Sequence, residues 1–153
     1  MRQRKARPAP ELATVDDLLC FSLYSTGLAM DRLYRKTLRP LNLTYAQYLV
    51  MLVLWQEDSI PVSELGARLF LDSATTSPIL QRLQANGLVS RQRAEEDERQ
   101  VLVSLTEAGK ALRTKALGVQ AEMNRVPCTA SDARELKRRL EDLREKLLDV
   151  AGR

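Results

Sequence analysis

The chain has 153 residues, of which 44% are hydrophobic and 29% are charged, values typical of one globular domain. It has 24 basic and 20 acidic residues and no histidine, which excludes His-based catalytic triads and His-containing metal sites. No apolar run approaches the roughly 18 residues of a membrane-spanning helix, and the basic N-terminus lacks the apolar core of a signal peptide. We therefore expect a cytoplasmic protein without metal, cofactor or membrane partner.

The first part of the chain predicts a basic arm and two helices. Residues 1–12 contain four basic residues and two prolines, and we expect this arm to be disordered. Apolar residues then recur every three or four positions, which predicts a helix capped by Thr14 and ending near Arg39, before Pro40. Thr44 is expected to cap a helix over 45–55, which is apolar on nearly all sides, as a core helix is.

Two short helices and a hairpin are predicted next. After a short extended segment at 59–62, Ser63 is expected to cap a helix over 64–70. A second helix covers about 74–85, with its inward face formed by Ile79, Leu80 and Leu83, and it must begin close before Pro78. The alternating runs 88–91 and 101–105 predict two strands, with a charged tip over 94–99.

The chain ends in two helices, over about 106–124 and from Ser131 onwards. Apolar residues in the last helix are spaced by four and three positions, a heptad pattern that predicts a seam against another helix: Leu136, Leu140, Leu143, Leu147 and Val150. The predicted fold is mainly α with a small β-hairpin. It comprises a winged helix-turn-helix over 41–105 and dimerisation helices over 13–40 and 106–153.

A helix, a tight turn, a second helix and a hairpin suggest binding to double-stranded DNA. Small hydroxyl side chains let a helix approach base edges, and arginines in the hairpin suit phosphates and the minor groove, with Asp97 orienting Arg99. The alternative is that the hydroxyls only cap a helix and the hairpin is a solvated turn. Net charge does not decide between these two interpretations, because residues 61–105 carry 5 basic and 6 acidic side chains. The candidate DNA contacts are Ser73, Thr75, Thr76, Ser77, Gln81, Arg82, Arg91, Arg93, Asp97 and Arg99.

Cys20 and Cys128 are the two cysteines. A static bridge across 108 residues is not expected in a cytosolic chain, so the thiols are either buried apolar residues or redox-active. The apolar neighbours of Cys20 favour burial when the pattern is taken alone.

Residues 18–116 resemble the MarR family of bacterial regulators, and most closely the OhrR-type organic hydroperoxide sensors. The resemblance rests on LLCFSLYS around Cys20, LNLTYAQYLVMLVLW, LDSATTSPILQRL and EEDERQVLVSLTEAG. It implies a homodimeric winged-helix repressor that binds a pseudo-palindromic operator and whose terminal helices form the dimer interface.

The resemblance also implies residue roles. Cys20 would be the thiol that organic hydroperoxides oxidise, and Tyr34 and Tyr45 would hydrogen-bond it. Cys128 of the other subunit would then form a disulfide with Cys20, and the repressor would leave its operator. Tyr34 lies 14 residues after Cys20, about 21 Å along a continuous helix, so the partner subunit must supply it. Interface packing is the alternative role for these tyrosines.

Two other functions remain open at this point. The first is a MarR-type repressor that a small phenolic or aromatic ligand releases from DNA. The second is a thiol peroxidase, which we disfavour because no lysine or arginine lies within four residues of Cys20 to stabilise a thiolate.

Overall fold

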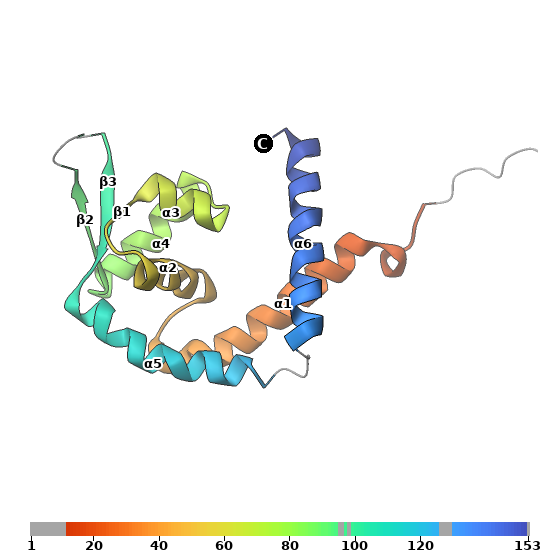
Figure 1. Cartoon of the computed structure of the whole chain (residues 1–153), viewed down its shortest axis with the longest axis horizontal. Coiled ribbons are helices and arrows are strands. Elements are labelled where there is room, and N and C mark those ends of the chain that lie inside the picture. Colours follow the sequence, from red (N-terminus) through yellow and green to blue (C-terminus); the bar gives the residue numbers. More distant parts are fainter. Residues whose placement is uncertain (1–11, 95–96, 98, 126–129, 153) are drawn as a thin grey trace, which may run out of the picture. The chain divides into compact units, whose positions relative to one another are not determined.

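The computed structural model describes residues 12–94, 97, 99–125 and 130–152, and it is mainly helical with one small sheet, as predicted (Figure 1). Residues 1–11 of the predicted arm, half of the predicted hairpin tip (residues 95, 96 and 98) and Cys128 lie outside the described residues. In chain order the elements are η1 (Val15–Asp17), α1 (Leu19–Leu38), η2 (Arg39–Leu41), α2 (Tyr45–Gln56), β1 (Ile60–Pro61), α3 (Val62–Leu69), α4 (Ser73–Ala85), β2 (Val89–Arg93), β3 (Val101–Leu105), α5 (Glu107–Met123) and α6 (Ala130–Ala151).

The chain forms two compact units, Met1–Arg113 and Thr114–Arg153, with the boundary inside α5. The first unit holds the helix-turn-helix, the sheet and the first turns of α5. It also holds α1, which contacts α2 and η2. The second unit holds the rest of α5 and α6. The assignment of the terminal helices to dimerisation stays a prediction.

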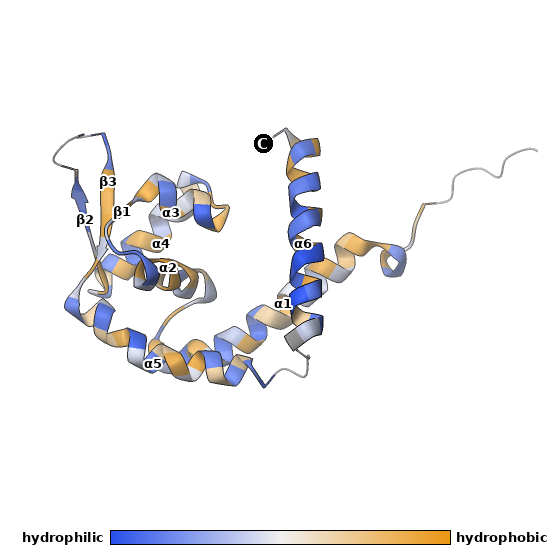
Figure 2. Cartoon of the chain, in the orientation of Figure 1, coloured by the Kyte–Doolittle hydropathy of each residue, from blue (hydrophilic) through white to orange (hydrophobic). Residues whose placement is uncertain are grey.

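The core of the first unit surrounds α2, which is apolar along nearly its whole length (Figure 2). This agrees with the sequence, because a helix without a polar face must be enclosed by other elements. Residues from α1, α2, α3, α4 and the sheet meet there with at most 2% of their surface exposed: Leu38, Val50, Met51, Leu54, Leu65, Leu80, Leu83, Val89 and Val103.

The predicted helix starts hold in part. At α2, Thr44 Oγ1 accepts from the Gln47 amide and Gln47 Oε1 accepts from the Thr44 amide, which makes the predicted cap a full capping box. The predicted start at Thr14 was wrong for the α-helix, because its hydroxyl donates to the Asp17 carboxylate at 2.7 Å. Residues 15–17 form a 3₁₀ turn, and α1 begins at Leu19.

The sheet explains a second difference. Ile60 and Pro61 pair with Val103 and Leu102, so the hairpin gains a third strand in the order β1-β3-β2. Because this pairing holds the chain up to Pro61, α3 starts at once at Val62, and the predicted Ser63 cap was wrong.

At α4 the cap is Asp72, one residue before the hydroxyls that the alternative interpretation took to be capping groups. Its carboxylate accepts from the Thr75 amide at 2.7 Å. Pro78 is the sixth residue of this helix, beyond the first turn that was expected to accommodate it. A proline has no N–H, so the Ala74 carbonyl lacks its usual helical donor.

A close contact joins α2, the end of α4 and the start of α5. The Leu88 carbonyl accepts from the Thr106 amide at 3.1 Å, and the Thr106 hydroxyl donates to the Gly87 carbonyl at 2.6 Å. The indole of Trp55 donates to the Gly109 carbonyl at 2.9 Å. A Cβ on Gly109 would lie 2.1 Å from the Leu88 oxygen, so only glycine fits this approach. The first turn of α5 is thereby fixed to the segment that follows α4.

No helix in the part of the chain that the structure describes has the length and apolar character needed to span a bilayer.

Candidate nucleic-acid interface and thiol site

The second helix of the helix-turn-helix, α4, presents most of the predicted DNA contacts to solvent. Leu80 and Leu83 are fully buried and anchor one face of the helix. The opposite face is polar, as the sequence predicts. Of the candidates on this helix, Ser73, Thr75, Gln81 and Arg82 are exposed and Ser77 is half-buried.

Thr76 is an exception, and its assignment as a DNA contact was wrong. Its side chain is 1% exposed, and its hydroxyl donates to the Asp72 carbonyl at 2.7 Å. Thr76 shares the inward face because Leu80 and Leu83 follow it by four and seven positions. It packs against Gly66, where an added Cβ would lie 3.3 Å from the threonine hydroxyl. Thr76 therefore stabilises the turn between α3 and α4.

The wing consists of β2, β3 and the segment between them (Figure 1). Arg91 is half-buried and donates to the Gln84 side chain at 2.7 Å, which ties β2 to the end of α4. Arg93, the last residue of the same strand, is exposed. Asp97 was expected to orient the guanidinium of Arg99, but its carboxylate accepts instead from the Arg99 amide at 3.0 Å. Asp97 thus contacts the backbone at Arg99.

The wing and α4 share one concave surface. Arg99 and Ser73 line the same hollow of about 450 Å³, together with residues of α3. The predicted minor-groove residue and the first residue of α4 therefore line one hollow, which suits a winged helix that contacts both grooves.

Tyr34 and Tyr45 stack on each other, with ring centroids 4.2 Å apart and planes inclined by 27°. Tyr48 completes the cluster at 6.1 Å from Tyr34, and Trp55 meets Tyr48 edge to face at 6.3 Å. Burial raises the pKa of all three tyrosines, and the neighbouring phenols raise that of Tyr34 further. The phenols are therefore neutral hydrogen-bonding groups at neutral pH. Tyr48 was not predicted, although its position three residues after Tyr45 places it on the same helix face.

Cys20 lies in the first turn of α1 and is exposed, contrary to the burial that its apolar neighbours favoured. The helix runs without a break to Leu38, so Cys20 and Tyr34 stand about 21 Å apart along its axis. The cysteine and the tyrosine pair do not meet within one chain, as the sequence predicts. Around Cys20, α1 exposes large apolar side chains by 39% to 64%: Leu19, Phe21, Tyr24 and Leu28.

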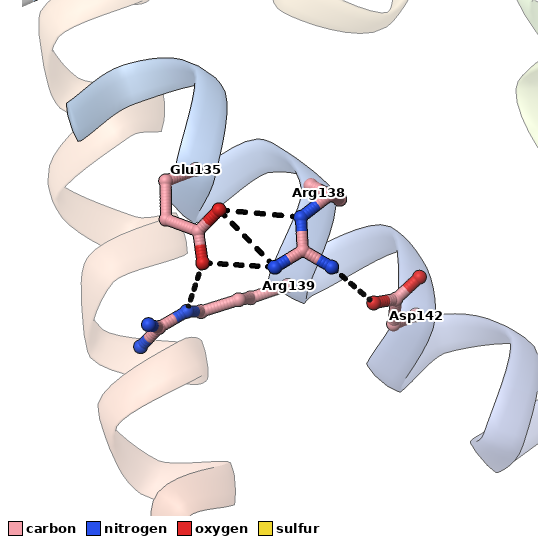
Figure 3. Close-up of polar contacts among 4 residues, drawn as sticks. All are labelled: Glu135, Arg138, Arg139 and Asp142. Atoms are coloured by element: carbon pink, nitrogen blue, oxygen red, sulfur yellow. Dashed lines mark hydrogen bonds and ion pairs between the residues drawn. The ribbon is translucent and has the colours of Figure 1, made fainter. Parts of the chain in front are cut away.

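The helix α6, taken by itself, has two different faces. On one face Glu135 bonds to Arg138 at 2.9 Å and to Arg139 at 2.7 Å, and Arg138 also contacts Asp142 at 3.3 Å (Figure 3). Such exposed pairs contribute little individually and keep that face hydrated. The predicted seam forms the other face, and four of its residues are 40% to 89% exposed: Leu136, Leu140, Leu147 and Val150.

Among the described residues, no group of three or more cysteine, aspartate or glutamate side chains is arranged to hold a metal ion.

Comparisons with known proteins identify relatives of this chain. Residues 32–115 match the family model for the transcriptional regulators SarA/Rot. The chain is 40% identical to the organic hydroperoxide resistance transcriptional regulator of Bacillus subtilis, over 87% of this chain and 91% of the relative. Reduced AbfR bound to DNA superposes with a TM-score of 0.78 at 32% identity, covering 87% of this chain and 92% of AbfR, a Staphylococcus epidermidis protein. AbfR with its disulfide formed matches with a TM-score of 0.60 at 32% identity, over 88% of this chain and 90% of that one.

Proposed function

The chain belongs to the MarR-type transcriptional regulators, and we propose that it is a homodimeric repressor that organic hydroperoxides release from operator DNA in the cytoplasm. In this proposal the oxidation of Cys20 is a signal and not a catalytic turnover. The likeness to the Bacillus regulator over most of both chains supports this choice.

The DNA-binding surface in this proposal is the exposed face of α4 and the wing. The polar residues of α4 enter the major groove, and Arg99 enters the adjacent minor groove. Arg91 and Arg93 contact phosphates, and Asp97 keeps the wing in shape. The likeness to AbfR in its DNA-bound form supports this arrangement.

Exposed apolar surface on α1 and on α6 supports a homodimer. Leucines that are half exposed along one side of a helix gain free energy when a second copy covers them. A two-fold dimer presents its two α4 helices about 34 Å apart, one turn of the double helix, which suits a pseudo-palindromic operator.

The stacked Tyr34–Tyr45 pair is the observation that carries the sensing proposal. The two phenols are brought together within one chain, yet they lie a helix length away from the cysteine of that chain. An exposed Cys20 from a second copy, arriving across a dimer interface, completes the site. Neutral phenols donate hydrogen bonds, which favour the thiolate over the thiol.

The proposed chemistry is a two-step oxidation. The Cys20 thiolate attacks the distal oxygen of the hydroperoxide; the O–O bond breaks, and the alcohol leaves after taking up a proton. The thiol of the partner subunit's Cys128 then attacks the sulfenic sulfur, which forms the intersubunit disulfide and releases water. Moving Cys20 toward Cys128 breaks the phenol contacts, and a preference of a few kcal/mol for the new arrangement is enough to empty the operator.

One experiment tests the sensor and its competitors together. Reduced protein is titrated with cumene hydroperoxide while binding to a selected operator duplex is followed, and each sample is run on a non-reducing gel. We expect operator binding to fall in step with the appearance of a dimer-sized covalent band. Release by a phenol without crosslinking would favour a ligand-responsive repressor, and continuous peroxide consumption with catalytic thiol would favour an enzyme.

Two single-atom changes assign the thiols. Cys20→Ser should bind the operator like the parent protein and stay bound in peroxide, because serine does not form a sulfenic acid. Cys128→Ser should still oxidise at Cys20, detectable with a dimedone probe, but should give no crosslinked band. Peroxide-induced release by Cys20→Ser, or a crosslinked band from Cys128→Ser, would contradict the respective assignment.

A further inference from the structure

A second basic surface lies at the end of α4 that is remote from Arg99. The last turn of α1, η2, the start of α2 and the end of α4 surround a hollow of about 520 Å³. Arg35, Arg39 and Arg82 all line it, and the described lining contains no acidic side chain. Arg35 and Arg39 are four residues apart, whereas Arg82 lies 43 residues further on, and the packing of α1 and α4 around α2 brings it to the other two.

The charges in this hollow are largely uncompensated. Arg35 pairs with Asp31 at 2.6 Å, but the Arg35 side chain is 77% exposed. Such an exposed ion pair contributes little free energy, so Arg35 can leave Asp31 for another anion at little cost. Within the described part of the chain, neither Arg39 nor Arg82 forms an ion pair. Guanidinium groups that converge on one hollow are a typical site for a phosphate group.

The hollow continues the face of α4 that we assign to DNA. Arg82 comes seven residues after Thr75, and Asn86 comes eleven residues after Thr75. The three positions therefore lie on one side of the helix. Thr75 is exposed, and Arg82 and Asn86 line the hollow. A ligand that contacts the exposed side of α4 therefore reaches this hollow.

The length of α4 matches the spacing of DNA phosphates. Ser73 shares a hollow with Arg99, and Arg82 lies nine residues further on, about 13.5 Å along the helix. The major groove is about 12 Å wide, so a helix whose axis crosses the groove has a sugar-phosphate chain near each of its ends. The wing supplies basic groups at the first end, and the hollow supplies them at the second.

The hollow also accounts for a charge problem in the sequence. Residues 61–105, which contain the helix-turn-helix and the wing, carry 5 basic and 6 acidic side chains. DNA binding depends strongly on cationic contacts with phosphates. Arg35 and Arg39 lie outside that segment, and the fold adds their charge to the end of α4.

We propose that this hollow binds a backbone phosphate of the operator, with Arg39 and Arg82 as its principal contacts and Arg35 at its rim. The proposal rests on the proposed function, because it takes α4 to be the helix in the major groove. Phosphate contacts carry no base specificity. The hollow therefore contributes affinity and register, and not the choice of sequence.

The test measures how binding depends on salt. A fluorescent operator duplex, selected from a random-sequence pool by the reduced protein, and an unselected duplex of equal length are titrated by anisotropy between about 50 and 300 mM NaCl. For Arg39→Gln we expect the slope of log K against log[salt] to be smaller by about 0.9 on both duplexes, and affinity to fall about five-fold at 0.15 M salt. Arg39→Lys should keep most of the slope, because it keeps the charge. Arg113→Gln on α5 is the matched control for the loss of one positive charge, and its slope should equal that of the parent.

The outcomes separate this inference from the proposed function. A parent protein that binds no duplex overturns both. A parent that binds its operator and is released by peroxide, while folded Arg39→Gln keeps the parental salt slope, overturns the hollow alone. Equal losses for Arg39→Gln and Arg113→Gln also overturn it, since bulk charge then explains the effect. Should inorganic phosphate raise the melting temperature of the parent but not of Arg39→Gln, with operator binding unchanged in that variant, the hollow is a small-anion site and the DNA assignment is wrong.

Discussion

Replacing Gly109 by alanine tests the contact that fixes α5 to the segment after α4. The added Cβ would lie 2.1 Å from the Leu88 carbonyl oxygen and 3.2 Å from a methyl of Leu105. Carbon and oxygen approach each other to about 3.3 Å without strain, so the first turn of α5 must move by about 1 Å. Overpacking costs about 1–3 kcal/mol, and each weakened hydrogen bond from Thr106 or Trp55 adds about 0.5–1.5 kcal/mol. We expect a total destabilisation of about 2–4 kcal/mol.

For a chain of 153 residues this loss lowers the melting temperature by roughly 5–15 °C. Circular dichroism melts at one protein concentration measure it, because the melting temperature of a dimer depends on concentration. Gly118 is the matched control on the same helix, since a Cβ there meets nothing within 4 Å. Gly118→Ala should stabilise the protein by about 0.5–1 kcal/mol through helix propensity. A melting temperature of Gly109→Ala at or above that of the parent would refute the argument.

Two further predictions concern the dimer and the tyrosines. Leu140→Ala should weaken self-association by about 2 kcal/mol per leucine, which is at least about 30-fold in the dissociation constant. Asp142→Ala, on the hydrated face of α6, should leave self-association unchanged. Sedimentation equilibrium measures both, and equal dissociation constants for the two variants would show that the leucine stripe is not the seam. Burial raises the pKa of Tyr34, Tyr45 and Tyr48 above 10.0, so the unfolded chain ionises first as the pH rises. The free energy of unfolding should be unaffected by these groups near neutrality and fall from about pH 10 upward, through the folded-state pKa values. Urea denaturation and tyrosinate absorbance measure this, and tyrosines that ionise at their ordinary pKa would contradict it.

Local signals in the sequence predicted the helices and the hairpin well, and their ends less well. The Thr44 cap was correct because the box that it forms with Gln47 involves only neighbouring residues. The Ser63 cap was wrong because the start of α3 depends on the pairing of Ile60 with Val103, which are 43 residues apart. When pairing with a distant strand sets the start of a helix, the residues at that start carry no local signal of it.

Residue type was an incomplete guide to the DNA-binding surface. Thr76 has the small hydroxyl that suits a base edge, but helical spacing from Leu80 and Leu83 directs it inward. That spacing was available in the sequence, and it predicts which way a side chain on the helix faces more reliably than the residue type does. Asp97 and Arg99 were expected to pair through their side chains, and only the backbone conformation of the wing shows the contact with the amide.

The order of helices and strands, the helix-turn-helix with its wing and the heptad stripe of the last helix follow from the sequence alone. Each depends on periodicity and caps within a few consecutive residues. The tyrosine cluster, the glycine contact at the start of α5 and the hollow formed by Arg35, Arg39 and Arg82 were decided by the tertiary structure. Each of these joins segments that are far apart in the chain, and their distances are set by how α1, α4 and the first turn of α5 pack on α2 and its neighbours. A side chain's neighbours across a core depend on packing and not on local pattern.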